Sequence, residues 1–196
     1  MNGIGRRNKA GEYTFIDRWA ELVTKHAKNV ALLFEAQEWT YADLDEQSNQ
    51  YGELFLELGI QQGQVVALCL CNTPEFLLCL VGLFKIGATV ALLNTNVCGS
   101  SFIHCLDVCK AKKVIYHKET LHVIKSIEQA RRDGLELFYC GTMTLGHGTR
   151  LEPHVKSTAP ISPIFRNQIK LTDTAVHIFT SGTTGLPKAA KINHMR

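Results

Sequence analysis

The chain has 196 residues, of which 45% are apolar and 20% are charged, and its formal net charge is +3. This length and composition allow one substantial hydrophobic core. Basic and acidic residues are spread through the sequence without a basic stripe, so we expect no nucleic-acid partner. The first nine residues are basic but no apolar segment follows them, which excludes a signal peptide.

Seven cysteines fall mostly inside apolar segments, and no Cys-x-x-Cys pair occurs. This pattern favours a reduced, cytosolic environment over a disulfide framework. His104, Cys105 and Cys109 could form part of a metal cluster. A second pair of ligands is missing, however, and the three positions fit the buried face of a helix, which we favour.

The first third of the chain predicts two helices with a hairpin between them. Apolar residues at helical spacing indicate an amphipathic helix over residues 12–28. Two strand-like runs at 30–34 and 38–40 predict the hairpin. Thr40 then suits the N-cap of a helix over residues 41–58, which Gly59 ends.

Residues 65–93 predict a βαβ crossover. It consists of a buried strand at 65–70, a helix through Phe84 with Thr73 as N-cap and Pro74 at its first position, and a second strand at 88–93. Such a unit predicts a parallel sheet. The apolar stretch 76–93 has roughly the length of a bilayer span. It contains Lys85 and two glycines, so we favour a buried helix and strand over a membrane span.

The same alternation continues with a helix over 101–110 capped by Ser100, a strand at 113–116, a helix over 118–133 and a strand at 135–140. The fold class predicted is therefore α/β, with mostly parallel strands flanked by helices in a doubly wound arrangement. Residues 141–173 hold three prolines and few apolar positions. We interpret them as a surface connection rather than a binding loop.

The most informative segment is the hydroxyl-rich loop, residues 180–188, which follows a strand at 175–179. It reads Thr-Ser-Gly-Thr-Thr-Gly-Leu-Pro-Lys and combines four hydroxyls, flexible glycines and one lysine. Such a loop can direct N–H and O–H donors at a polyphosphate. The P-loop motif is excluded because Pro187 stands where it needs glycine and Ala189 where it needs a hydroxyl. An ordinary turn is the remaining alternative.

The candidate phosphate contacts are the hydroxyls and glycines of this loop and its lysine: Thr180, Ser181, Gly182, Thr183, Thr184, Gly185 and Lys188. Lys188 would supply the positive charge, although it could instead be a solvated strand residue, which is the favoured reading of Lys191. Asn94 and Asn96 could line a substrate wall, but we favour a turn held by Asx hydrogen bonds.

Residues 179–188 resemble the phosphate loop of the adenylate-forming enzymes, the acyl-CoA synthetase superfamily, at every position of the pattern aromatic-Thr-Ser-Gly-Thr-Thr-Gly-x-Pro-Lys. Together with Leu-Leu-Asn-Thr-Asn at 92–96 and the Ala-Ala pair at 189–190, they resemble the fatty acid transport protein branch, the very long-chain acyl-CoA synthetases. Cys98 stands where this branch usually has arginine, and Lys191 where it usually has an apolar residue.

The resemblance implies an ATP-dependent ligase that joins a long or very long fatty acid to coenzyme A through an acyl-adenylate, with Lys188 as a catalytic residue. Residues 1–196 would form a partial N-terminal AMP-binding domain, with the C-terminal lid domain absent. The Gly-x-Thr-Glu motif that holds Mg²⁺ and the Thr-Gly-Asp motif that holds ribose do not occur. We therefore expect the chain alone to be inactive.

The resemblance also implies membrane association of the whole protein, at the endoplasmic reticulum, peroxisome or plasma membrane, with the catalytic part facing the cytosol. Two alternatives from other classes stay open. The chain could be a non-catalytic module that binds a partner or lipid, or a membrane transport component without ligase chemistry.

Overall fold

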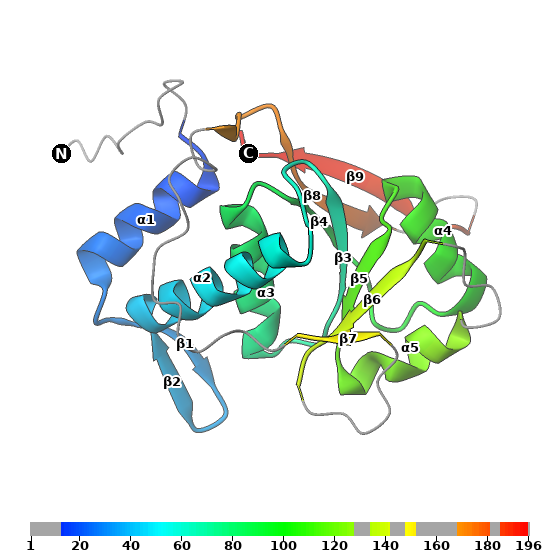
Figure 1. Cartoon of the computed structure of the whole chain (residues 1–196), viewed down its shortest axis with the longest axis horizontal. Helices are drawn as coiled ribbons and strands as arrows, with labels where there is room; N and C mark the ends of the chain where they lie inside the picture. The colour runs from blue at the N-terminus through cyan, green and yellow to red at the C-terminus, as the bar shows by residue number, and fades with distance from the viewer. Residues whose placement is uncertain (1–12, 128–133, 142–147, 152–167, 181–184, 196) are drawn as a thin grey trace.

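The computed structural model describes residues 13–127, 134–141, 148–151, 168–180 and 185–195. Its centre is a seven-stranded sheet in the order β7-β6-β5-β3-β4-β8-β9, with helices on both faces (Figure 1). Neighbouring strands are parallel except β8 and β9, which are antiparallel. The predicted α/β class with a mostly parallel sheet is confirmed.

The strands of this sheet are β3 Val65–Cys69, β4 Thr89–Leu92, β5 Lys113–Tyr116, β6 Glu136–Tyr139, β7 Thr149–Arg150, β8 Thr174–Thr180 and β9 Lys188–Asn193. The helices are α1 Phe15–His26, α2 Tyr41–Glu57, α3 Pro74–Lys85, α4 Gly99–Cys109 and α5 Leu121–Ser126, with a 3₁₀ turn, η1, at Lys118–Thr120. A separate hairpin consists of β1 Val30–Phe34 and β2 Gln37–Thr40.

Two hydrophobic cores lie on opposite faces of the sheet, because side chains alternate along each strand. Val66 and Leu68 of β3 pack in the core that contains α2 and α3. Ala67 and Cys69 of the same strand pack in the core that contains α4 and α5. Strands buried on both faces explain the continuous apolar runs in the sequence.

Several element boundaries confirm the sequence predictions. Thr40 is the N-cap of α2: its hydroxyl accepts a hydrogen bond from the amide of Asp43 at 3.2 Å, and the Asp43 carboxylate accepts one in return from the Thr40 amide at 2.9 Å. The apolar stretch 76–93 divides between α3 and β4, as favoured above. In the part of the chain that is described, no helix is both long and apolar enough to cross a membrane.

Other boundaries differ from the prediction. The fourth helix has Cys98, not Ser100, as its N-cap, because the Gly99 amide is already bound by the hydroxyl of Ser126 at 2.8 Å. The single helix predicted over 118–133 is instead η1 followed by α5, which ends at Ser126; residues 128–133 lie outside the described part. Thr73 is the N-cap of α3 with Pro74 at its first position, as predicted, although the Thr73 side chain makes no capping hydrogen bond.

The bounds and pairing partners of two further strands were not predicted. Within the predicted connection 141–173, β7 pairs with β6 in parallel, and after the hydroxyl-rich loop β9 returns along β8. Short strands of this kind lack a hydrophobic period of their own, and their positions depend on the neighbour that offers hydrogen bonds. The rest of the connection, 142–147 and 152–167, lies outside the described residues.

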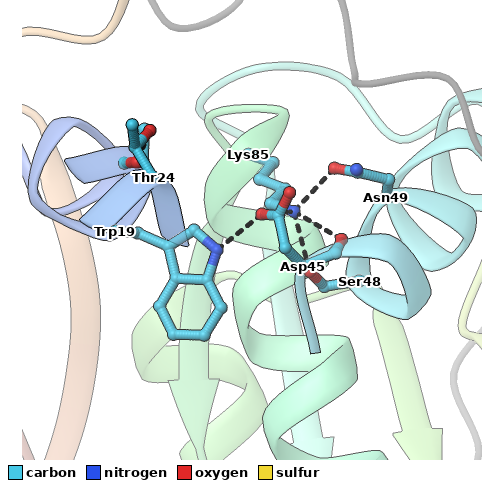
Figure 2. A network of polar contacts seen from close by, with 7 residues as sticks. Trp19, Thr24, Asp45, Ser48, Asn49 and Lys85 are labelled. Carbon is cyan, nitrogen blue, oxygen red and sulfur yellow. Dashed lines mark hydrogen bonds and ion pairs between the residues drawn. The ribbon is translucent and has the colours of Figure 1, made fainter. Parts of the chain in front are cut away.

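A buried lysine fixes α3 against α2 (Figure 2). The Lys85 ammonium lies 2.6 Å from the Asp45 carboxylate and 2.6 Å from the Asn49 side-chain oxygen, with the Ser48 hydroxyl at 2.8 Å. Asp45 also accepts a hydrogen bond from the Trp19 indole at 2.7 Å, which connects α1 to the same cluster. Burial lowers the pKa of Lys85, and the charge of Asp45 partly opposes that shift. The lysine that argued against a membrane span therefore has polar partners.

Candidate phosphate-binding site

The hydroxyl-rich loop joins β8 to β9 as a hairpin. Thr180, the last residue of β8, lies opposite Lys188, the first residue of β9. Because β8 runs parallel to β4, the loop leaves the sheet at the edge where the parallel strands have their carboxyl ends. This is the edge at which open α/β sheets bind their ligands.

The structure places part of the predicted site. Thr180 and Lys188 are exposed, with their backbones paired across the hairpin. Gly185 has φ of +83°, a left-handed conformation that glycine adopts without strain. Ser181, Gly182, Thr183 and Thr184 lie outside the described residues, so their roles stay predictions. The geometry brings the two ends of the loop together and leaves the lysine accessible to a ligand.

The segment after β4 forms the turn that was favoured over a substrate wall. The amide of Asn96 donates to the Asn94 side-chain oxygen at 2.9 Å, and the amide of Val97 donates to the Asn94 carbonyl at 3.1 Å. Asn94 of the same turn also lines a pocket of about 370 Å³, together with Cys71, Thr95 and other residues that follow β3 and β4, so Asn94 has both the turn geometry and a place in a pocket wall. The pocket and the hydroxyl-rich loop therefore lie at the same edge of the sheet.

One residue of this region has a contact that sequence reasoning missed. His104, half-buried on α4, has its Nε2 atom 3.1 Å from the carbonyl oxygen of Pro187, the residue before Lys188. A carbonyl only accepts hydrogen bonds, so Nε2 must carry the proton and donate it. The two residues are 83 positions apart, and no local pattern in the sequence signals such a pairing.

The metal alternative for His104 finds no support in the geometry. Within the described ranges, no three His, Cys, Asp or Glu side chains come together in a way that could hold a metal ion. Burial raises the pKa of Cys105 to about 11 and that of Cys69 to about 12. Their thiols therefore stay protonated near neutral pH and are poor nucleophiles.

His177 lies within β8, three residues before the end of the strand. It is 4% exposed, and it lies opposite Lys191 of β9 in the strand register. Burial lowers its pKa, and the charge of Lys191 lowers it further. Lys191 itself is exposed on β9, in agreement with its interpretation as a solvated strand residue.

Comparison with known sequences shows to which family the chain belongs. The chain matches the family model of the AMP-binding enzyme over residues 18–196. It is 36% identical over 188 residues to long-chain fatty acid transport protein 2 of Rattus norvegicus, covering 93% of this chain and 30% of that protein. It is 30% identical to crotonobetaine/carnitine–CoA ligase of Salmonella heidelberg (strain SL476), covering 90% of this chain and 35% of that protein.

Two solved structures share the fold. The anthranilate CoA ligase AuaEII in complex with anthranoyl-AMP superposes with a TM-score of 0.77 and 23% identity, covering 93% of this chain and 35% of that one. The luciferase-like enzyme of the mealworm Zophobas morio superposes with a TM-score of 0.78 and 22% identity, covering 99% of this chain and 44% of that one.

The chain thus spans about a third of the length of the curated relatives it matches. Within that span, the family model covers nearly the whole chain, and the fatty acid transport proteins found among its relatives confirm the resemblance stated from the sequence. The chain belongs to the AMP-binding enzyme family.

Proposed function

We propose that the chain supplies the phosphate-binding part of an ATP-dependent ligase that converts a long or very long fatty acid into its coenzyme A thioester and thereby assists fatty acid uptake. The observation that carries the proposal is the hydroxyl-rich loop, which matches the family pattern throughout and leaves the carboxyl end of a parallel strand. In the proposed reaction, a fatty carboxylate attacks the α-phosphorus of ATP, pyrophosphate leaves, and coenzyme A then displaces AMP.

Lys188 has the main chemical role in this proposal. Negative charge grows on pyrophosphate as it leaves, and a lysine held in place beforehand lowers the energy of that state. The hairpin fixes where the Lys188 backbone begins, opposite Thr180, so that less conformational freedom is lost when phosphate binds. We assign Thr180, Ser181, Thr183 and Thr184 as hydroxyl donors to the phosphate oxygens, while Gly182 and Gly185 allow close approach of the backbone.

Magnesium, when bound with ATP, neutralises phosphate charge. Residues 180–188 contain no acidic residue, so this loop supplies no carboxylate ligand for Mg²⁺. The Gly-x-Thr-Glu motif that the family resemblance implies for Mg²⁺ does not occur in the sequence either, and we assign no metal ligand in this chain.

Association of the whole protein with a membrane also belongs to the proposal and depends on the family resemblance alone.

Titration of the purified chain with inorganic pyrophosphate and with ATP tests the phosphate site. Lys188→Ala should weaken pyrophosphate binding by about tenfold or more, since it removes a charged hydrogen bond. Lys191→Ala is the matched control, because it removes an exposed lysine of the same strand. Equal losses from both variants would indicate nonspecific attraction to basic charge, and the absence of binding would contradict the proposal.

The fatty acid part of the proposal needs a separate test in a longer protein that contains this segment. Long and very long fatty acids, acetate, an aromatic acid and an amino acid would compete for acyl-adenylate formation. A preference for long fatty acids supports the proposal, and a preference for acetate or an amino acid rejects it. If ATP binds but none of these acids leads to release of pyrophosphate, the non-catalytic alternative is favoured.

A further inference from the structure

The hydroxyl-rich loop is attached to the rest of the molecule at a point outside its own hairpin. The Nε2–H of His104 donates to the carbonyl oxygen of Pro187 at 3.1 Å. Figure 1 shows α4 beside the start of β9, so this contact joins a helix on one face of the sheet to the chain that leads into the last strand.

The helix that carries His104 is itself firmly anchored. Its neighbours Phe102, Cys105 and Leu106 are buried in the core between α4, α5 and the sheet. Side chains on a packed helix hold their positions better than side chains on loops. His104 can therefore serve as a fixed reference point for the residue that it contacts.

Pro187 is a position where such support has a particular effect. Proline has no backbone N–H, so its carbonyl is its one backbone group able to hydrogen-bond. That carbonyl belongs to the peptide bond whose nitrogen is the backbone nitrogen of Lys188, the first residue of β9. Gly185, two residues earlier, has a left-handed conformation, so the chain has just turned. Holding the Pro187 carbonyl thus fixes the direction in which the chain enters Lys188.

We propose that His104 is a positioning residue for phosphate binding: its hydrogen bond to Pro187 sets the backbone of Lys188 before a polyphosphate arrives. This inference rests on the proposed function of Lys188. Without the contact, the loop would sample more conformations and would lose more entropy on binding, so the affinity for phosphate would fall. His104 itself need not touch the ligand.

The variants His104→Phe, His104→Asn and His104→Gln separate the hydrogen bond from simple packing. Phenylalanine keeps a ring without a donor, and asparagine keeps an amide that is too short to reach. Glutamine can present an amide N–H close to the position of Nε2. His122→Phe is the matched control, because exposed His122 also contacts a carbonyl, that of Glu119 at 3.0 Å, but lies on α5.

The first measurement needs no ligand. Amide hydrogen exchange should become faster at the beginning of β9 in His104→Phe and His104→Asn, while the far end of the strand, near Ile192, should stay as in the unchanged chain. His104→Gln and His122→Phe should leave both ends as they are. Unchanged exchange at Lys188 in the Phe and Asn variants would overturn the inference, and the Asn–Gln pair decides the question if the Phe variant does not fold.

The second measurement is titration with inorganic pyrophosphate. The Phe and Asn variants should bind about fivefold more weakly, the effect of one ordinary hydrogen bond, and the Gln variant should come within about twofold of the unchanged chain. Binding that is present, sensitive to Lys188→Ala and unaffected by His104→Phe would overturn this inference alone. Absence of pyrophosphate binding by the unchanged chain would overturn the proposed function and this inference with it.

Discussion

At the scale of single residues, the proposed phosphate site depends on one exposed charge at a defined place. Lys188 begins β9 and lies opposite Thr180, so its backbone is held on one side by the hairpin and on the other by the contact from His104 to Pro187. Its side chain stays exposed. A lysine whose backbone is held in place and whose ammonium group is exposed can stabilise the negative charge that develops on a leaving group.

In a ligase that contains this segment, we expect Lys188→Ala to slow acyl-adenylate formation by about two orders of magnitude or more, the usual cost of losing one transition-state donor. Exchange of labelled pyrophosphate into ATP, measured with palmitate, reports that step directly. Lys191→Ala, on the same strand, should retain the normal rate. An unchanged rate in Lys188→Ala would show that the role assigned to this lysine is wrong.

The buried His177 leads to a pH prediction. Its pKa in the folded chain is lowered from the ordinary value of 6.5 by burial and then by the charge of Lys191. As the pH falls through about 6.5, the unfolded chain binds a proton that the folded chain does not. The contribution of the neutral His177 to the free energy of unfolding is therefore fully present above that pH and is lost progressively below it.

Thermal unfolding at about pH 7.5 and about pH 5.5 tests this linkage. The chain should unfold at a lower temperature in acid, and His177→Gln should show a smaller difference between the two conditions. His194, whose pKa burial also lowers, would supply part of the remaining difference. The exposed His122 gives the control variant His122→Gln, and an equal reduction there would contradict the assignment to His177.

At the scale of elements, α2 and α3 pack closely against each other at Gly82. A Cβ atom added at Gly82 would lie 3.0 Å from the backbone oxygen of Ser48 and 3.1 Å from the backbone nitrogen of Gly52. Both neighbours are backbone atoms of a helix, so they cannot turn aside as a flexible side chain can. Because Gly82 has no side chain, α3 can approach α2 closely, and the hydrogen bonds of Lys85 to α2 hold the two helices at that distance.

Gly82→Ala should lower the free energy of unfolding by about 1–2 kcal/mol. Overpacking of this kind typically costs about 1–3 kcal/mol, and the better helix propensity of alanine offsets at most about 1 kcal/mol of it. Urea unfolding measures the change, with Glu46→Ala on the exposed side of α2 as the control. A variant more stable than the unchanged chain would show that the two helices can separate slightly at little cost.

At the scale of the whole molecule, the described sheet positions the two ends of the hydroxyl-rich loop and does little more of the proposed chemistry by itself. The sequence contains neither the Gly-x-Thr-Glu motif nor the Thr-Gly-Asp motif that the family resemblance requires for magnesium and ribose. Phosphate contacts alone do not align a carboxylate for attack on the α-phosphorus.

The purified 196-residue chain, incubated with ATP, magnesium, palmitate and coenzyme A, should therefore form no acyl-CoA above the background without protein. Mass spectrometry of the thioester provides the measurement. A longer ligase with the same hydroxyl-rich loop is the positive control. Steady turnover by the 196-residue chain would contradict the division of roles proposed here.

Much of this fold could be predicted from local patterns. The buried runs at β3, β4 and β5, the crossover through α3 and the cap at Thr40 follow from hydrophobic period and local hydrogen-bonding chemistry. The hydroxyl-rich loop followed from composition, and its family from a complete motif. The start of α4 was misplaced because a side chain from α5, the Ser126 hydroxyl, binds the Gly99 amide.

The sequence by itself determined which residues are candidates for holding phosphate, because hydroxyls, glycines and a lysine in one short segment are local properties. Only the tertiary structure decided how that segment is held. The antiparallel return of β9 depends on hydrogen bonds that β8 offers, and the donor to Pro187 comes from a helix 83 residues earlier in the chain. Contacts between distant residues arise when the sheet and its two cores assemble, so no local pattern records them.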